Sequence, residues 1–134
     1  MTETTTVSET VPSTSHHTTT VIVGAGQAGL ATAYHLTRAG HDCVVLDRNR
    51  RVGDQWRRRY DSLLLNTPAR CSALPGLPFP APGGTYPTSS QLADYHEEYA
   101  RHFGIAFEGG LSVDAIEQVG SGWRVSTDRG TYDA

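Results

Sequence analysis

The chain has 134 residues, a formal net charge of −3 and eleven arginines without a lysine. This length is typical of one small domain, and a mildly acidic chain lacks the basic surface that a nucleic-acid-binding domain normally needs. No stretch approaches the roughly eighteen apolar residues of a membrane span, and Cys43 and Cys71 lie too far apart for the CxxC spacing of a metal or redox pair. We therefore expect a cytoplasmic protein that binds no metal, no nucleic acid and no membrane.

Residues 1–18 consist mostly of Thr, Ser, Glu and Val, with neither the apolar run of a membrane anchor nor the basic start of a signal peptide. Such a composition buries too little apolar surface to fold, so we expect a disordered tail followed by one domain over residues 19–134. Within that domain, residues 18–23 are β-rich and end in three aliphatic side chains before Gly24. This pattern predicts a buried parallel strand.

An amphipathic helix is expected next, over residues 27–39. Apolar side chains recur there at helical spacing, and Gly40 follows in the position of a left-handed cap. Residues 43–46 form a second apolar stretch, which ends in Asp47. Together these segments predict a β-α-β unit of about thirty residues, the size that a parallel crossover requires.

Residues 48–90 contain six of the seven prolines and show little periodicity, which predicts a long ordered loop with a functional role. Thr88 and Gln91 then have the spacing of a capping box, at the start of a helix expected over residues 89–103. Beyond it we expect a third strand at residues 105–107 and an antiparallel meander. The meander strands are predicted at residues 111–119, at residues 123–127 and from about residue 131 onward.

Three glycines follow the first expected strand with GxGxxG spacing, and each has its own mechanical reason to be there. Gly24 permits the tight turn, Gly26 lets the backbone approach a pyrophosphate, and Gly29 lets helix and strand pack closely. The amides that open the helix, including those of Gln27 and Ala28, join the positive end of the helix dipole in an anion site that needs no basic side chain. The structural alternative is an ordinary glycine-rich turn.

The acidic residue at the end of the second strand supports the nucleotide interpretation. Asp47 follows Gly24 by twenty-three residues, where a carboxylate can accept hydrogen bonds from the ribose hydroxyls of an adenosine. Arg48 is a candidate phosphate contact, and a solvated surface arginine is the equal alternative. This unit alone does not separate FAD from NAD(P), because both contain adenosine diphosphate.

The segments after Asp47 narrow the choice, because their order resembles the flavin-containing monooxygenase family, which includes Baeyer–Villiger and plant YUCCA-type members. The resemblance runs from about residue 19 to the end of the chain. It rests on five segments: Arg51-Val52-Gly53-Asp54-Gln55-Trp56, Tyr60-Asp61-Ser62-Leu63, Asn66-Thr67-Pro68, Leu74-Pro75-Gly76-Leu77-Pro78-Phe79-Pro80 and Tyr86-Pro87-Thr88. The order of these segments is more specific than the glycines alone.

The resemblance assigns roles to several of these residues. The segment from Gly53 to Trp56, with Gln55 between them, is implied to run beside the flavin, where the family commonly has Gly-Gly-x-Trp. Because Asp54 replaces the second glycine, we expect the backbone facing the flavin to differ. Asn66 is implied to lie near the reactive face of the isoalloxazine and to help hold the oxygenated flavin. The alternatives are that Asn66 caps a turn before the following proline and that Trp56 only fills the core.

The chemistry that the resemblance implies is reduction of FAD by NADPH, addition of O₂ to the flavin and transfer of one oxygen atom to a small-molecule substrate. The implied fold is α/β, a Rossmann-like FAD-binding domain with a parallel sheet and an antiparallel β-meander, here truncated. The second GxGxxG, for NADPH, and strands 4 and 5 of the order 3-2-1-4-5 have no counterpart in the sequence. We therefore expect residues 21–23 to form an apolar edge prone to self-association, and the chain alone to hold FAD weakly without NADPH-dependent activity.

Two other functions are open from the sequence. One is an NAD-dependent dehydrogenase, for which Asp47 would select NAD by binding its ribose. The other is a non-catalytic FAD-binding half that docks with a separate chain carrying the missing strands. Mass spectrometry of the bound nucleotide separates the dehydrogenase from a flavoprotein.

Overall fold

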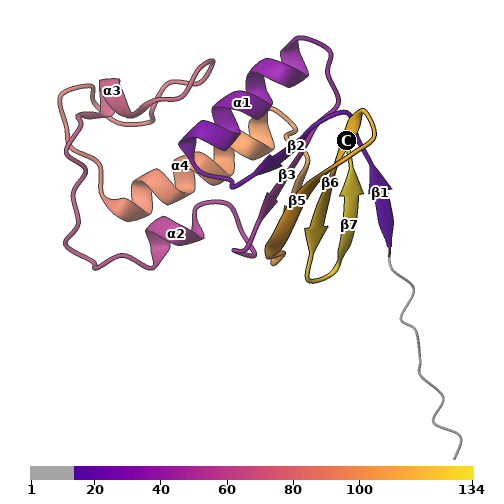
Figure 1. Cartoon of the computed structure of the whole chain (residues 1–134). Coiled ribbons are helices and arrows are strands. Elements are labelled where there is room, and N and C mark those ends of the chain that lie inside the picture. The colour runs from indigo at the N-terminus through magenta and orange to yellow at the C-terminus, as the bar shows by residue number, and fades with distance from the viewer. Residues whose placement is uncertain (1–13) are drawn as a thin grey trace, which may run out of the picture.

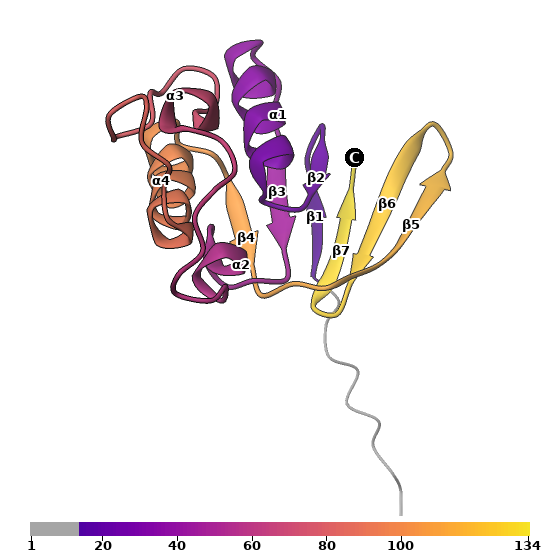
Figure 2. The same cartoon turned by 90° about the vertical axis from the view of Figure 1, so that its left-hand side faces the viewer.

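The computed structural model of the chain describes residues 14–134, which form two β-sheets and a group of helices (Figure 1). In chain order the elements are β1 (Ser15–His17), β2 (Val21–Val23), α1 (Gln27–Arg38), β3 (Val44–Asp47), α2 (Asp54–Arg57), α3 (Ala69–Ser72), α4 (Ser89–His102), β4 (Phe107–Gly109), β5 (Val113–Val119), β6 (Gly122–Thr127) and β7 (Gly130–Asp133). In Figure 1, β2 and β3 lie between the helices and the strands β5, β6, β7 and β1, and Figure 2 shows the molecule from the helical side, with α1 over β3. The predicted α/β class is confirmed.

The central sheet is parallel and has the order β2-β3-β4. Ile22 pairs with Val45, and Val45 pairs in turn with Phe107. These three strands take the places expected for strands 1, 2 and 3 of a doubly wound sheet. β2 lies at the edge of this sheet, as predicted, and Val23 at its end is 51% exposed.

The strand β3 divides the core in two, because its successive side chains point to opposite faces. Val45 packs with Leu30 of α1 in a cluster on the helical side. Val44 and Leu46 belong to a second cluster, whose other buried members are Leu111, Val125 and Tyr132. Burial on both faces is typical of a parallel strand with a continuous apolar sequence. The prediction of a buried strand was made for residues 18–23 and is wrong there, because β2 at the sheet edge is only partly buried at Val21 and Ile22.

Helix α1 begins and ends within one residue of its predicted bounds. Leu30 and Ala33 are fully buried on the face that covers the sheet. After the C-cap residue Ala39, the chain turns through Gly40 at φ = +81°, a conformation that favours glycine. The β-α-β unit predicted from the sequence is therefore confirmed.

Helix α4 holds the proline-rich segment in place. It begins with the predicted capping box, in which Gln91 N donates to Thr88 Oγ1 at 3.1 Å and Thr88 N donates to Gln91 Oε1 at 2.8 Å. On its buried face, the hydroxyls of Tyr95 and Tyr99 donate to backbone carbonyls of the proline-rich segment, each at 2.6 Å. The expected long loop is thus ordered, and it contains two four-residue helices, α2 and α3, that its lack of periodicity did not predict.

The third parallel strand, β4, begins two residues later than predicted. Ile105 is buried, but its N–H donates to Ala100 O at 2.9 Å, so this residue closes the turn that follows α4 and does not begin the strand. Gly104, at φ = +60°, turns the chain there. The apolar side chain of Ile105 thus signalled burial against the helices and not strand pairing.

The second sheet has the order β1-β7-β6-β5, in which β5, β6 and β7 form the predicted antiparallel meander. Of the predicted disordered tail at residues 1–18, residues 1–13 lie outside the described part of the chain. The predicted end of the tail at residue 18 is wrong, because Ser15–His17 form a strand that pairs in parallel with β7. The His16 ring also stacks on Tyr132, with 4.9 Å between ring centroids. A polar composition did not predict this strand, because pairing uses backbone groups that every sequence carries. Among the described residues, no helix has the length and apolar character to cross a bilayer.

Candidate functional site

The glycine-rich turn joins β2 to α1 and leaves backbone amides open. Gly24 has φ = +103°, which favours glycine, and a Cβ on Gly29 would overlap the carbonyl oxygen of Gly24. Gly26 caps α1 in an extended conformation without a side-chain hydrogen bond, and no acidic residue occupies the first turn. The first amides of the helix, including those of Gln27 and Ala28, are therefore available to an anion.

The carboxylate of Asp47 reaches this turn from the end of β3. Its Oδ2 accepts a hydrogen bond from the N–H of Ala25 at 2.8 Å, and its Oδ1 accepts two from Asn49, one from the backbone N at 2.7 Å and one from Nδ2 at 2.9 Å. A carboxylate has about four lone-pair sites, and these three hydrogen bonds leave about one of them, on Oδ2, for a ribose hydroxyl. The structure thus brings Asp47 to the helix start, as predicted. The role of Asn49 was not predicted from the sequence. The signal that could have indicated it is Asp47 two residues earlier, because an Asp side chain often accepts a hydrogen bond from the backbone N–H two residues on, as in an Asx turn.

A pocket of about 350 Å³ adjoins the turn, and we call it the carboxylate pocket. It brings together Gly24, Asp47, Arg48 and Gln55, with aliphatic side chains from β2, β3 and β5 on its walls. Arg48 is exposed and makes no ion pair with the described residues. Its two interpretations, a phosphate contact and a solvated arginine, therefore both stand.

A second pocket, of about 490 Å³, lies at the first turn of α1, and we call it the tryptophan pocket. Gln27 and Ala28 line it together with Trp56 and Asn66. The alternative that Asn66 caps the turn before the proline gains no support, because its side chain makes no hydrogen bond within residues 14–134 and α3 has no side-chain cap. Trp56 packs partly against the helical core, so it both fills the core and borders the pocket. The sequence did not predict the further lining residues, which include Leu65, Cys71 and Leu92.

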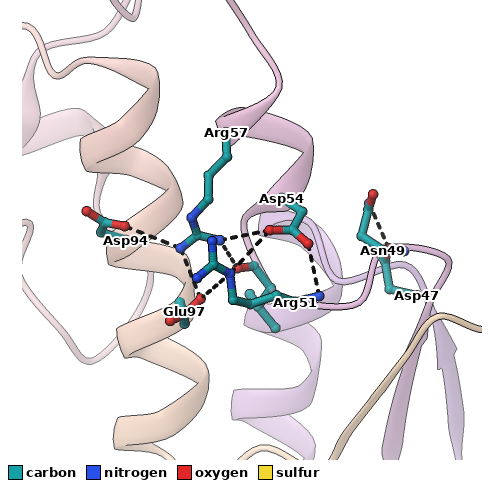
Figure 3. A network of polar contacts seen from close by, with 8 residues as sticks. Asp47, Asn49, Arg51, Asp54, Arg57, Asp94 and Glu97 are labelled. Atoms are coloured by element: carbon teal, nitrogen blue, oxygen red, sulfur yellow. Dashed lines mark hydrogen bonds and ion pairs between the residues drawn. The ribbon is translucent and has the colours of Figure 1, made fainter.

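The turn from Gly53 to Trp56 passes from one pocket to the other. Gly53 has φ = +90°, and a Cβ there would lie 2.9 Å from the Cα of Ala93 on α4, so the position requires glycine. Asp54 lines neither pocket. Its carboxylate accepts hydrogen bonds from Arg51 N at 3.1 Å, Arg51 Nε at 3.3 Å and Arg57 Nη1 at 3.2 Å (Figure 3).

The two arginines also set the protonation of Asp54. Burial raises the pKa of the Asp54 carboxyl, but the hydrogen bonds from Arg51 and Arg57 outweigh burial and hold its pKa below the ordinary value. The side chain is therefore a carboxylate at neutral pH. The expectation that the backbone here differs from the Gly-Gly-x-Trp pattern stays a prediction.

Comparison with known proteins extends over most of the chain. The sequence profile of the family described as pyridine nucleotide-disulphide oxidoreductase matches residues 21–134. An uncharacterized oxidoreductase described as CzcO-like, from Geobacillus kaustophilus, is 36% identical over 119 residues, which cover 89% of this chain and 34% of that protein. Indole-3-pyruvate monooxygenase YUCCA1 from Oryza sativa subsp. japonica is 42% identical over 113 residues, which cover 82% of this chain and 28% of that protein.

A solved structure is similar in both fold and sequence. The flavin-containing monooxygenase from Stenotrophomonas maltophilia matches with a TM-score of 0.80 and 29% identity, over 88% of this chain and 36% of that one. The chain thus spans about a third of the length of the relatives that it matches.

Proposed function

The chain belongs to the pyridine nucleotide-disulphide oxidoreductase family, and from this premise we propose that it binds FAD as the amino-terminal part of an NADPH-dependent flavin monooxygenase. The resemblance to flavin-containing monooxygenases that the sequence indicated is confirmed by the relatives. NADPH as the reductant and oxygen transfer to a small-molecule substrate are parts of the proposal. They concern the whole enzyme, of which this chain corresponds to about a third.

The observation that carries the proposal is the meeting of the Asp47 carboxylate with the uncapped start of α1, between two pockets. A diphosphate fits at the helix start, because anions are stabilised there by open N–H groups and by the helix dipole. Gly26 leaves room for it, since a Cβ there would meet only Gln55 Nε2, at 3.5 Å. Asp47 Oδ2 then accepts a hydrogen bond from the adenosine ribose in the carboxylate pocket.

The tryptophan pocket favours a flavin over a nicotinamide dinucleotide at this site. Its walls include Trp56, Leu65 and Leu92, which suit a flat, largely apolar ring system. Asn66 supplies an amide that has no hydrogen-bond partner among residues 14–134 and is able to donate to or accept from a polar edge of the ring. When bound, FAD supplies the electron transfer and oxygen chemistry, and the chain's own residues bind and orient it.

Calorimetric titration of FAD into the full chain tests this proposal, with Asp47→Asn and Asp42→Asn as a matched pair. Asp47 ends β3 beside the glycine turn, whereas Asp42 precedes the same strand at its other end and accepts a hydrogen bond from Thr18. Hydrogen bonds to charged groups contribute about 1.5–3 kcal/mol, so Asp47→Asn is expected to weaken FAD binding roughly ten- to hundredfold, and Asp42→Asn to leave it unchanged. A wild-type chain that binds no FAD, or equal affinities for both variants, contradicts the proposal.

A further inference from the structure

The short helix α2 lines both pockets, each with one of two consecutive side chains. Gln55 lines the carboxylate pocket and Trp56 lines the tryptophan pocket. Yet α2 has only four residues, none of them buried. A helix of this length has no stability of its own, so contacts with other elements must set its position.

Arg57 makes the polar contacts that join α2 to α4 (Figure 3). Nη1 of Arg57 donates to Val52 O at 2.7 Å and to Asp54 Oδ1 at 3.2 Å. Nη2 donates across to α4, to Asp94 Oδ1 at 3.3 Å and to Glu97 Oε2 at 3.0 Å. The planar guanidinium thus joins α2 to α4 through two edges, which a lysine ammonium cannot reproduce. We call Arg57, Asp54, Asp94 and Glu97 the α2–α4 clamp.

The members of the clamp differ in exposure, and this decides which contacts matter. The side chains of Arg57 and Asp54 are 19% and 17% exposed, whereas that of Asp94 is 77% exposed. Exposed ion pairs are screened by water and contribute little, so Arg57 acts mainly on Asp54 and on the half-exposed Glu97. Arg51 reinforces both, with its Nε 3.3 Å from Asp54 Oδ1 and 3.2 Å from Glu97 Oε2.

From these contacts we infer that the α2–α4 clamp positions Trp56 against the flavin ring, with Arg57 as a positioning residue of the cofactor site. Arg57 lines neither pocket, so it acts through α2. The inference rests on the proposed FAD function. It has its own signature, because ADP fills the carboxylate pocket and the diphosphate site but does not reach Trp56. Loss of the clamp therefore weakens the binding of FAD more than that of ADP.

The test compares the affinities of the full chain and its variants for FAD and for ADP at low ionic strength. Arg57→Gln removes the clamp, and Glu97→Gln removes one partner on α4 while leaving Arg57 in place. Arg58→Gln is the matched control, because Arg58 follows directly, is exposed and makes no ion pair with the described residues. We expect Arg57→Gln to weaken FAD binding about five- to tenfold and ADP binding less than about twofold, with a smaller change of the same kind in Glu97→Gln and none in Arg58→Gln.

A double-mutant cycle with Trp56→Leu separates positioning from a general loss of structure. If the clamp acts through Trp56, Arg57→Gln lowers the FAD-to-ADP affinity ratio in the wild-type background and leaves it unchanged in the Trp56→Leu background. An equal loss for FAD and ADP, or the same ratio change in both backgrounds, overturns the inference. If Arg57→Gln does not fold, the same comparison of FAD-to-ADP affinity ratios is made with Glu97→Gln in the wild-type and Trp56→Leu backgrounds. A wild-type chain that binds ADP but not FAD contradicts the proposed function itself.

Discussion

Gly26 and Gly29 belong to the same motif, but only Gly26 lies beside the proposed diphosphate site, whereas Gly29 packs against the turn and β2. At Gly26, which has an extended backbone at φ = −82°, a Cβ meets only the flexible end of Gln55 at 3.5 Å, an ordinary van der Waals contact. At Gly29, a Cβ overlaps the carbonyl oxygen of Gly24 and lies 3.4 Å from Ile22 Cγ2. The first position is open to solvent and ligand, and the second is closed by the strand β2. Alanine at each position therefore tests a different claim.

The magnitudes follow from these contacts. Overpacking against neighbouring atoms costs about 1–3 kcal/mol, and alanine regains up to about 1 kcal/mol over glycine inside a helix. We expect Gly29→Ala to lower the free energy of unfolding by about 1–2 kcal/mol, because α1 must move away from β2. Gly26→Ala is expected to lower it by less than about 1 kcal/mol, the cost of alanine in place of glycine at an N-cap. The same substitution should weaken FAD binding more than about tenfold, because its methyl group takes the space of the diphosphate.

Urea denaturation of both variants and of the wild-type chain measures the stability difference, and FAD titration of the folded proteins measures affinity. Full FAD affinity in Gly26→Ala would refute the claim that the ligand approaches this backbone closely. Unchanged stability in Gly29→Ala would refute the close packing of helix and strand. The two variants control for each other, because both add one methyl group to the same turn.

Two further predictions concern burial and the sheet edge. Burial lowers the pKa of His96 to about 4 from an ordinary value of 6.5. As the pH falls, the unfolded chain therefore binds a proton at this residue before the folded chain does. The stability that neutral His96 contributes is complete above pH 6.5 and is lost between about pH 6.5 and 4. Urea denaturation should show that the free energy of unfolding falls by up to about 2 kcal/mol between pH 6.5 and 5. His96→Gln should reduce this fall. A free energy of unfolding that does not change with pH in the wild-type chain would contradict the prediction. The exposed edge of β2 leads us to expect self-association at high concentration, which Val23→Lys should suppress in analytical ultracentrifugation. A chain that stays monomeric at high concentration without the substitution would contradict that expectation.

Local signals in the sequence were enough to predict the β-α-β unit and α4. Gly24, Gly29 and Gly40 each serve a conformation or a close approach that can be argued from neighbouring residues. The capping box of Thr88 and Gln91 likewise involves residues three apart. Asp47 was predictable because the end of one parallel strand lies beside the turn that follows its neighbour.

Features that depend on distant partners were not predictable in the same way. Strand β1 forms because Ser15–His17 meet β7 near the other end of the chain. The pairing of Arg57 with Glu97 joins residues forty apart, and the six arginines between Arg48 and Arg59 gave no sign of which one is shielded. The lining of the tryptophan pocket by Leu65 and Leu92 depends on how α4 folds back on the proline-rich segment.

In the proposed function, the open amides at the start of α1 and the carboxylate of Asp47 bind the diphosphate and ribose of a nucleotide. The most direct measurement is a ¹H–¹⁵N NMR titration of the chain with ADP, which reports on each backbone amide. We expect the largest shifts on the amides of residues 25–29 and of Asn49, whose N–H donates to Asp47. Saturable binding that leaves these amides unmoved and shifts others instead would contradict this expectation.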